Sequence, residues 1–210
     1  MSKLLTFGCS NTYGHGLPDC WDADKKLPTE NPSKFAWPSL LAKHMSLVCN
    51  NLSRPGSSCK EVWWKIVNTK FDRSDIVIVL WPNLDRSCII DPENPEFPEH
   101  LAHWARTRAG KYFTQLHTFR NAYDREIEGK QQIQLADIYL KNQGVENVYH
   151  FITQEDNWST DFQWFDVEIH GADNQAWGYR YFDKALDNHH PGIRSHQMLA
   201  EYIHKTIERQ

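Results

Sequence analysis

The chain has 210 residues, of which 40% are hydrophobic and 24% are charged, and its formal net charge is −4. A chain of this length supports one sizeable core. The negative charge argues against a nucleic-acid binder held by bulk electrostatics, since phosphate binding requires Lys and Arg, and no stretch approaches the roughly 18 apolar residues of a membrane span.

Five cysteines occur at wide spacings, with no CxxC pair. An odd number without a paired motif favours reduced thiols over a disulfide framework or a zinc site. The first residues also lack the apolar run of a secretory signal. We therefore expect a cytoplasmic protein.

Taken in chain order, apolar and β-branched runs predict four strands. The run DIVIVLW at 75–81 is the strongest, and its uninterrupted apolar character is typical of a strand buried on both faces of a parallel sheet. The four expected strands are 3–7, 46–53, 75–81 and 147–153.

Helical patterns alternate with these strands. The serines of the turn at 54–58 are placed to cap the helix that begins at Cys59. A helical region is expected from about 100 to 143, broken near Gly129. The remaining expected helices cover 35–45 and 191–208, and loops are expected at 14–34, at the proline-studded acidic stretch 91–99 and over the irregular segment 154–186.

Strands that alternate with helices predict an α/β protein, with a parallel sheet covered on both faces. We expect a single domain over 1–210, with a helical and Trp-rich irregular insertion at about 91–186. In such sheets the reactive groups gather at the carboxyl ends of the strands.

Polar residues and a glycine follow the predicted strands at that edge. Ser10 comes after the first strand, and Asp187 and His190 precede the last helix. A serine becomes a nucleophile when a histidine accepts its proton and a carboxylate orients the histidine. Gly56 and Asn83 follow the second and third strands and offer amide donors to an oxyanion. Each residue alone is also explained as a turn former or helix cap.

Four blocks, FGCSNTYG, NLSRPGSS, VIVLWPNLDR and DNHHPG, together resemble the SGNH, or GDSL-like, hydrolases. The resemblance implies a three-layer α/β/α sandwich with a flavodoxin-like parallel sheet, and an esterase or deacetylase activity. By position it implies Ser10 as nucleophile, His190 as general base and Asp187 as the residue that orients His190. It also implies an oxyanion hole formed by the amides of Ser10 and Gly56 and the side chain of Asn83.

Three residues depart from the family pattern. Cys9 stands where the family has aspartate, and we do not expect it to be the nucleophile because no base is assigned to it. In the third block, Trp81 replaces a glycine and Leu84 replaces an aspartate. Trp81 is expected to crowd or to line the acyl pocket.

Other side chains have two interpretations. His189, His190 and His196 suggest a metal site, but the triad uses His190 and no Cys or carboxylate set completes a zinc shell, so neither a metal nor a cofactor is expected. His15 is expected on the loop surface. Several tryptophans in polar sequence either cover the core or line a binding cleft, namely Trp21, Trp158, Trp164 and Trp177.

Two functions follow from these residues. The first is a serine esterase acting on a small-molecule, carbohydrate or lipid ester. The alternative is a catalytically weak or inactive SGNH-fold domain that binds a carbohydrate or peptide through 154–186. The intact Ser10, Asp187 and His190 favour the hydrolase. No nucleic-acid partner is expected, and nothing in the sequence indicates the oligomeric state.

Overall fold

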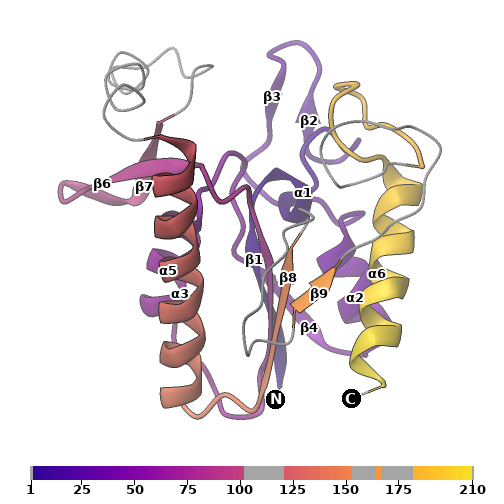
Figure 1. Cartoon of the computed structure of the whole chain (residues 1–210). Helices are drawn as coiled ribbons and strands as arrows, with labels where there is room; N and C mark the ends of the chain where they lie inside the picture. The colour runs from indigo at the N-terminus through magenta and orange to yellow at the C-terminus, as the bar shows by residue number, and fades with distance from the viewer. Residues whose placement is uncertain (1, 102–120, 153–163, 167–181, 210) are drawn as a thin grey trace.

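The computed structural model describes residues 2–101, 121–152, 164–166 and 182–209. Its centre is a five-stranded parallel sheet (Figure 1). Numbered along the chain, the strands follow the order 2-1-3-4-5, which is typical of flavodoxin-like sheets. Across the sheet they are β4 (Val48–Asn51), β1 (Lys3–Gly8), β5 (Ile76–Trp81), β8 (Asn147–Ile152) and β9 (Trp164–Asp166).

Helices cover both faces of this sheet and complete three layers (Figure 1). One face is covered by α3 (Cys59–Val67) and α5 (Ala122–Asn142). The other is covered by α2 (Trp37–His44) and α6 (Ile193–Ile207). The predicted α/β/α sandwich is confirmed.

The central strand β5 explains how the layers are held together. Val77 and Val79 pack in the core beneath α3 and α5, whereas Ile78 and Leu80 pack beneath α2 and α6. All four side chains are at most 1% exposed. Burying an aliphatic side chain of this size contributes about 1.5–3 kcal/mol, so this strand stabilises both layers, as its apolar run predicted.

The start of α3 also follows from local sequence. The Ser58 hydroxyl accepts a hydrogen bond from the Glu61 backbone amide at 3.3 Å, which satisfies one of the unpaired donors of the first turn. This confirms the predicted serine cap. The loop before α3 is therefore tied to the helix, and it brings Gly56 to a defined position.

The predicted break near Gly129 is wrong, because α5 runs without interruption through this residue. A Cβ on Gly129 would lie 2.6 Å from the carbonyl oxygen of Leu84. The glycine therefore permits close contact between the helix and the turn after β5. Of the helical region expected at 100–143, residues 102–120 lie outside the described residues.

The loop expected at 91–99 is a hairpin of β6 (Ser87–Asp91) and β7 (Asn94–Leu101). Proline is tolerated in such a ribbon because each strand has one edge without a hydrogen-bonded neighbour. The Asp91 carboxylate closes the turn by accepting the Glu93 amide at 2.9 Å. The acidic and proline-rich composition therefore marked a turn and its flanking strands.

Two other expected loops contain strands. A short antiparallel pair, β2 (Trp21–Asp22) and β3 (Leu27–Pro28), lies within 14–34. The edge strand β9 lies within 154–186, and the remaining described residues of that segment are 182–186. Elements of two or three residues are too short to show a hydrophobic period, and for this reason the sequence analysis missed them.

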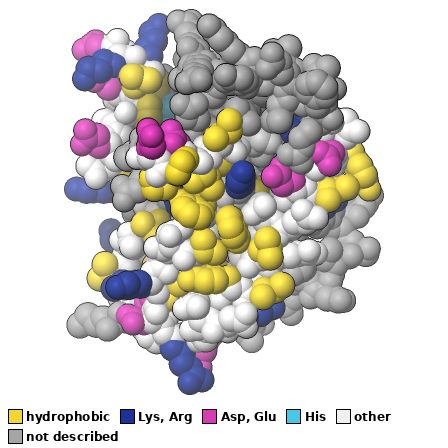
Figure 2. All heavy atoms as spheres, turned by 90° about the vertical axis from the view of Figure 1, so that its left-hand side faces the viewer, with side chains coloured by type: hydrophobic (Ala, Val, Ile, Leu, Met, Phe, Trp, Pro, Cys, Tyr) yellow, Lys and Arg dark blue, Asp and Glu magenta, His cyan; other side chains and the backbone are white. Residues whose placement is uncertain are grey.

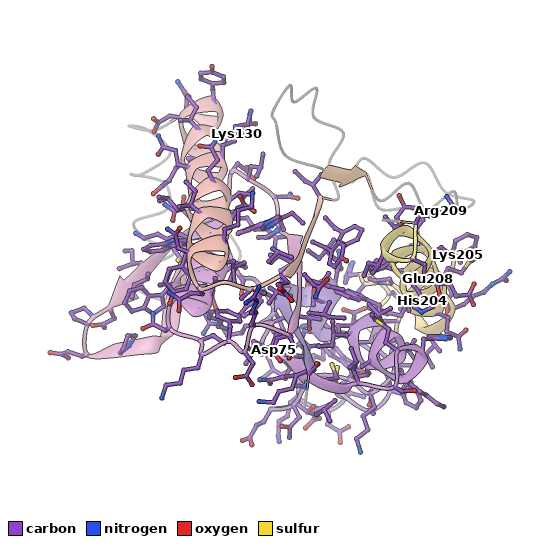
Figure 3. All side chains as sticks on the ribbon, turned by 90° about the horizontal axis from the view of Figure 1, so that it is seen from below. Asp75, Lys130, His204, Lys205, Glu208 and Arg209 are labelled. Carbon is purple, nitrogen blue, oxygen red and sulfur yellow. The ribbon has the colours of Figure 1, made fainter. Side chains whose placement is uncertain are left out.

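The amino edge of the sheet carries structural charges (Figure 3). The buried Asp75 carboxylate accepts the amides of Lys3 at 3.0 Å and Asp72 at 2.9 Å. In the last turns of α6, His204 and Glu208 approach to 3.6 Å. Both chain termini lie at this edge (Figure 1). A site is expected at the opposite edge, because ligands bind at the carboxyl ends of the strands in such sheets.

Helix α5 leaves several apolar side chains exposed. Figure 2 shows apolar side chains gathered on the face of the molecule formed by α3 and α5. The exposed apolar side chains of α5 are Tyr123, Ile127, Leu135 and Ile138.

No helix within the described ranges is both long enough and apolar enough to cross a membrane.

Candidate active site

Ser10 is the first residue of α1 (Ser10–Tyr13), a single turn that follows β1. Gly8 is the last residue of β1, and a Cβ there would lie 2.8 Å from the Leu80 carbonyl oxygen and would overlap the Thr12 side chain, so the glycine permits α1 to begin directly after the strand. The chain therefore leaves the sheet at its carboxyl edge with Ser10 on the bend. The Ser10 hydroxyl points toward Cys9 Sγ at 3.9 Å.

Asp187 and His190 form a tight pair in the loop before α6. His190 Nδ1 lies 2.5 Å from Asp187 Oδ2, and Asp187 Oδ1 accepts the amides of His189 at 3.0 Å and His190 at 3.1 Å. Burial would raise the pKa of Asp187, but the hydrogen bonds from the His190 ring and from these amides outweigh it and hold that pKa well below its usual range. Asp187 is thus an ionised acceptor that orients the ring of His190.

This loop is fastened to the N-terminal part of the chain. The Leu186 amide donates to the Gly16 carbonyl oxygen at 2.9 Å, and the Ala185 amide donates to the His190 carbonyl oxygen at 2.9 Å. Gly16 has a φ of 84°, and a Cβ there would lie 2.7 Å from Asp187 Oδ1. The glycine therefore permits residues 16 and 187 to approach, which brings an N-terminal loop and a C-terminal loop together.

A cavity of about 1100 Å³ lies between these loops, at the carboxyl edge of the sheet. Ser10 and His190 both line it, although no hydrogen bond joins their side chains in the part of the chain that the structure describes. Asn83 is half-buried in the turn after β5 and is not among the lining residues. Those residues are Ser10, His15, Trp21, Ala23, Lys26, Pro55, Gly56, Arg86, Leu186, Asp187, Asn188, His189 and His190.

Gly56 reaches the cavity through a tight turn. The Ser57 amide donates to the Arg54 carbonyl oxygen at 3.2 Å, and Gly56 has a φ of 83°. Proline followed by a residue with positive φ is the pattern of a type II turn, and Pro55-Gly56 fits it. The lack of a side chain leaves the Gly56 backbone accessible to a ligand.

Asn51 connects this second loop to α1. Its Nδ2 donates to the Thr12 carbonyl oxygen at 2.8 Å, and its Oδ1 accepts the Ser53 amide at 3.2 Å. One side chain therefore fixes the loop that carries Gly56 relative to the turn that carries Ser10. This is a structural role for the asparagine of the second block.

His15 is a site residue that the sequence analysis missed, because we expected it on the loop surface. Its side chain is only 17% exposed, and its Nε2 lies 3.7 Å from Asp187 Oδ2. Its ring centroid lies 4.4 Å from that of His190 and 5.2 Å from that of Trp21. The flanking glycines, both with positive φ, turn the chain inward here, and the pattern Gly-His-Gly was the available signal.

The electrostatics of His15 follow from this position. Burial, and then the neighbouring His190, lower the pKa of His15 to about 4, against the opposing effect of Asp187. His15 is therefore neutral at pH 7. Trp21 covers its ring and lines the cavity, which fits the cleft interpretation for this one tryptophan, whereas Trp158 and Trp177 lie outside the described residues.

The histidines are grouped differently from the metal set considered in the sequence. His196 is buried in the core, where its Nδ1 accepts the Trp37 amide at 3.2 Å, and burial lowers its pKa to about 3. His15, Asp187 and His190 instead place one ligand atom each within 4.8 Å of one another. These three residues have the donor types that hold a divalent transition metal.

Trp81 does not line the cavity, contrary to the expectation for the acyl pocket. It is 1% exposed, packs beneath α3 and α5, and donates from Nε1 to His150 Nδ1 at 3.0 Å. Leu84 is equally buried and contacts α5 at Gly129. Both departures in the third block therefore face the core.

No known family profile matches the chain, and no curated protein is significantly similar to it. Among solved structures, it is similar to an acetyl xylan esterase from the rumen bacterium Butyrivibrio proteoclasticus, with 15% identity and a TM-score of 0.46, over 99% of this chain and 63% of that one. A carbohydrate esterase family 2 enzyme plus carbohydrate binding domain from Corynascus thermopiles (Myceliophthora fergusii) has 14% identity and a TM-score of 0.49, over 99% and 66%.

A further carbohydrate esterase has 14% identity and a TM-score of 0.47, over 100% of this chain and 65% of that one. The chain thus spans less than two thirds of the length of these three proteins. At such identities, the chemistry of this chain has to be argued from its own residues.

Proposed function

We propose that the chain is a serine hydrolase that cleaves an ester or another acyl bond. The observation that carries this proposal is the Asp187–His190 pair at the wall of the cavity that Ser10 also lines. Asp187 occupies Nδ1 of His190, so Nε2 is the nitrogen left to accept a proton from Ser10. The arrangement has the three parts that an activated serine requires.

The reaction would proceed through an acyl-enzyme. Ser10 Oγ attacks the carbonyl carbon of the substrate while His190 Nε2 takes its proton, and collapse of the tetrahedral intermediate passes that proton to the leaving alcohol. A water molecule then attacks the acyl-enzyme by the same route, which releases the acid and restores Ser10.

Backbone amides are the proposed donors to the negative oxygen of the intermediate. The Ser10 amide lies at the start of α1, where it has no acceptor within the helix. The Gly56 amide lies within a turn that lines the same cavity. Asn83 is the proposed third donor, and its contribution requires the side chain to turn toward Ser10.

Ser10 and His190 need not be hydrogen-bonded without a substrate. Catalytic hydrogen bonds are often long in ligand-free enzymes and tighten in the substrate complex. The ring of Trp21 offers an apolar wall for the acyl or alcohol part of a small-molecule, carbohydrate or lipid ester. A domain that only binds a carbohydrate or peptide is the alternative, and an activated serine separates the two.

A fluorophosphonate probe tests this distinction, since it labels only an activated serine. We expect one covalent adduct on Ser10 in the parent and none in Ser10→Ala. Ser39→Ala is the matched control, because Ser39 lies in α2, does not line the cavity, and donates to the Ser33 carbonyl oxygen. A folded parent protein that takes up no label would overturn the proposal and leave the binding function.

A further inference from the structure

Arg86 lines the same cavity as Ser10, and the mechanism above assigns it no role. It lies in the turn after β5, where its amide donates to the Asn83 carbonyl oxygen at 3.2 Å, and its side chain lines the cavity with Ser10. Its Nη1 is buried and has no hydrogen-bond partner among the described residues. Burying a charged donor without an acceptor costs free energy. A nitrogen without a hydrogen-bond partner at a cavity wall therefore points to a ligand that supplies the acceptor.

Two carboxylates near this guanidinium have other partners. The adjacent Asp85 lies near Arg125, whose Nη2 is 3.9 Å from Asp85 Oδ2 and whose Nε donates to the Asp85 carbonyl oxygen at 3.0 Å. The cavity carboxylate, Asp187, is hydrogen-bonded to the His190 ring and to two backbone amides. Within the described residues, no hydrogen bond or ion pair joins either side chain to Arg86.

The charge of Arg86 also affects a buried thiol of α3. Burial raises the pKa of the Cys59 thiol, and the positive charge of Arg86 is the largest influence that opposes this rise. Cys59 is the first residue of α3, and Cys9, the residue before Ser10, also affects its pKa. The charge of Arg86 therefore acts on the same buried thiol as the residue before Ser10.

Charge in the cavity is opposite in sign to that of the chain. Among the described residues, the lining contains two cations, Lys26 and Arg86, and one carboxylate, Asp187, which is paired with His190. The whole chain has a formal net charge of −4. The cavity wall is therefore locally positive although the whole chain is negative, and a positive wall attracts anionic ligands.

We propose that Arg86 forms an anion subsite beside Ser10 and that the natural substrate is an ester with a carboxylate group close to its scissile bond. This inference rests on the proposed hydrolase function and specifies its substrate class. The fork of donors on a guanidinium matches the two oxygens of a carboxylate. The ammonium group of Lys26, which also lines the cavity, adds a second positive charge to this wall.

Paired esters that differ only in this charge test the subsite. The first pair is 4-acetoxybenzoate and its methyl ester, with the charge on the alcohol side. The second is 4-nitrophenyl hydrogen adipate and its methyl ester, with the charge on the acyl side. Each rate is divided by the uncatalysed rate. We expect the parent kcat/KM to favour the anionic member of at least one pair by about tenfold or more, the size of a charge-assisted contact.

Arg86→Gln should lower kcat/KM for the anionic ester about tenfold more than for the neutral one. Arg73→Gln is the matched control, since Arg73 pairs with Glu146 at the amino edge of the sheet and is largely exposed. It should keep the parent preference. Equal rates on both members of both pairs by an active parent would overturn the subsite and leave the proposed hydrolase standing.

Binding to Ser10→Ala separates the two proposals. Calorimetry with 4-hydroxybenzoate and with methyl hydrogen adipate, each against its neutral methyl ester, requires no turnover. If the parent hydrolyses no ester, but a carboxylate binds and Arg86→Gln weakens its affinity about tenfold, the hydrolase fails and the anion subsite stands. Equal affinity for charged and neutral ligands would overturn the subsite.

Discussion

Replacing Asp187 by asparagine removes a charge and an acceptor while the side chain keeps its size. Asp187 Oδ1 accepts two backbone amides, from His189 and His190, at 3.0 and 3.1 Å. The asparagine carbonyl oxygen must stay in that place, because the reversed amide would direct its NH2 at two donors. The NH2 then takes the place of Oδ2, which lies 2.5 Å from His190 Nδ1.

An NH2 group at that place requires His190 to accept at Nδ1, so the ring proton moves to Nε2. A protonated Nε2 cannot take the proton of Ser10, and the equivalent tautomer change in a serine protease triad lowers kcat by about 10⁴. Stability should change little, because both backbone hydrogen bonds remain and the third is kept with its direction reversed. Loss of charge assistance costs about 1 kcal/mol, or about 2–4 °C in Tm for a domain of this size.

The measurements are kcat on 4-nitrophenyl acetate and the thermal melt of the same sample, with nitrogen NMR of the His190 ring to report its tautomer. Asp183→Asn is the matched control. Asp183 caps α6 by accepting the amides of Ser195 at 2.8 Å and Arg194 at 3.0 Å, so this variant should melt lower with an unchanged kcat. An Asp187→Asn enzyme that retains kcat within about tenfold of the parent would refute the assignment of the base.

Four other variants test separate parts of the site and fold. Ser10→Ala should fold with the parent Tm and lose about 10³ or more of kcat, measured on the same ester. Asn83→Ala should lower kcat by about 10²–10³ if its side chain turns to the oxyanion, whereas a loss of only about 1 kcal/mol of stability would identify it as a turn or cap residue. The folded pKa of His15, about 4, is below the unfolded value of 6.5, so the unfolded state binds more protons in this range and stability falls as pH falls through it. Between pH 7 and pH 5, the free energy of unfolding in urea should fall by up to about 2 kcal/mol less in His15→Gln than in the parent. An equal fall in both proteins would contradict this pKa. Gly129→Ala should gain about 1 kcal/mol of helix propensity but lose about 1–3 kcal/mol to the clash with the Leu84 carbonyl oxygen, so urea unfolding should show net destabilisation.

The predictable parts of the fold are those with a clear local signal, such as an apolar run or a helix cap. The run at 75–81 became β5 with both faces buried, and the serine before Cys59 became the cap of α3. Both depend on local spacing, which the sequence contains. The pair β6–β7 was missed because Pro and Glu are poor strand residues, and only the unpaired edges of a two-stranded ribbon tolerate them.

The site was predictable where the topology alone brings residues to one edge. Ser10 and Gly56 follow strands of the parallel sheet, and Asp187 and His190 precede the helix α6 that packs on it, so all four line one cavity. His15 was missed because its place depends on tertiary contact: the backbone turns at two glycines and meets the loop of Asp187. No periodicity in the sequence reports that contact.

Residues 81–86 divide their side chains between the core and the cavity. Trp81 and Leu84 are buried against α3 and α5, whereas Arg86 lines the cavity. The two departures from the SGNH pattern therefore affect packing, and they leave the wall near Ser10 to a cation. Trp81 and Leu84 therefore occupy none of the cavity that Ser10 lines.

A positive wall has two consequences for the proposed reaction. It attracts an anionic substrate, and it also stabilises the oxyanion that any ester forms in the transition state, since charges act strongly where water is excluded. Arg86 thus contributes to the hydrolysis of neutral esters as well, and its removal should slow both members of each ester pair. His15 adds nothing to this field at pH 7, because burial keeps its ring neutral. The ratio of the two rates, and not either rate alone, therefore separates recognition of the substrate carboxylate from general stabilisation of the transition state.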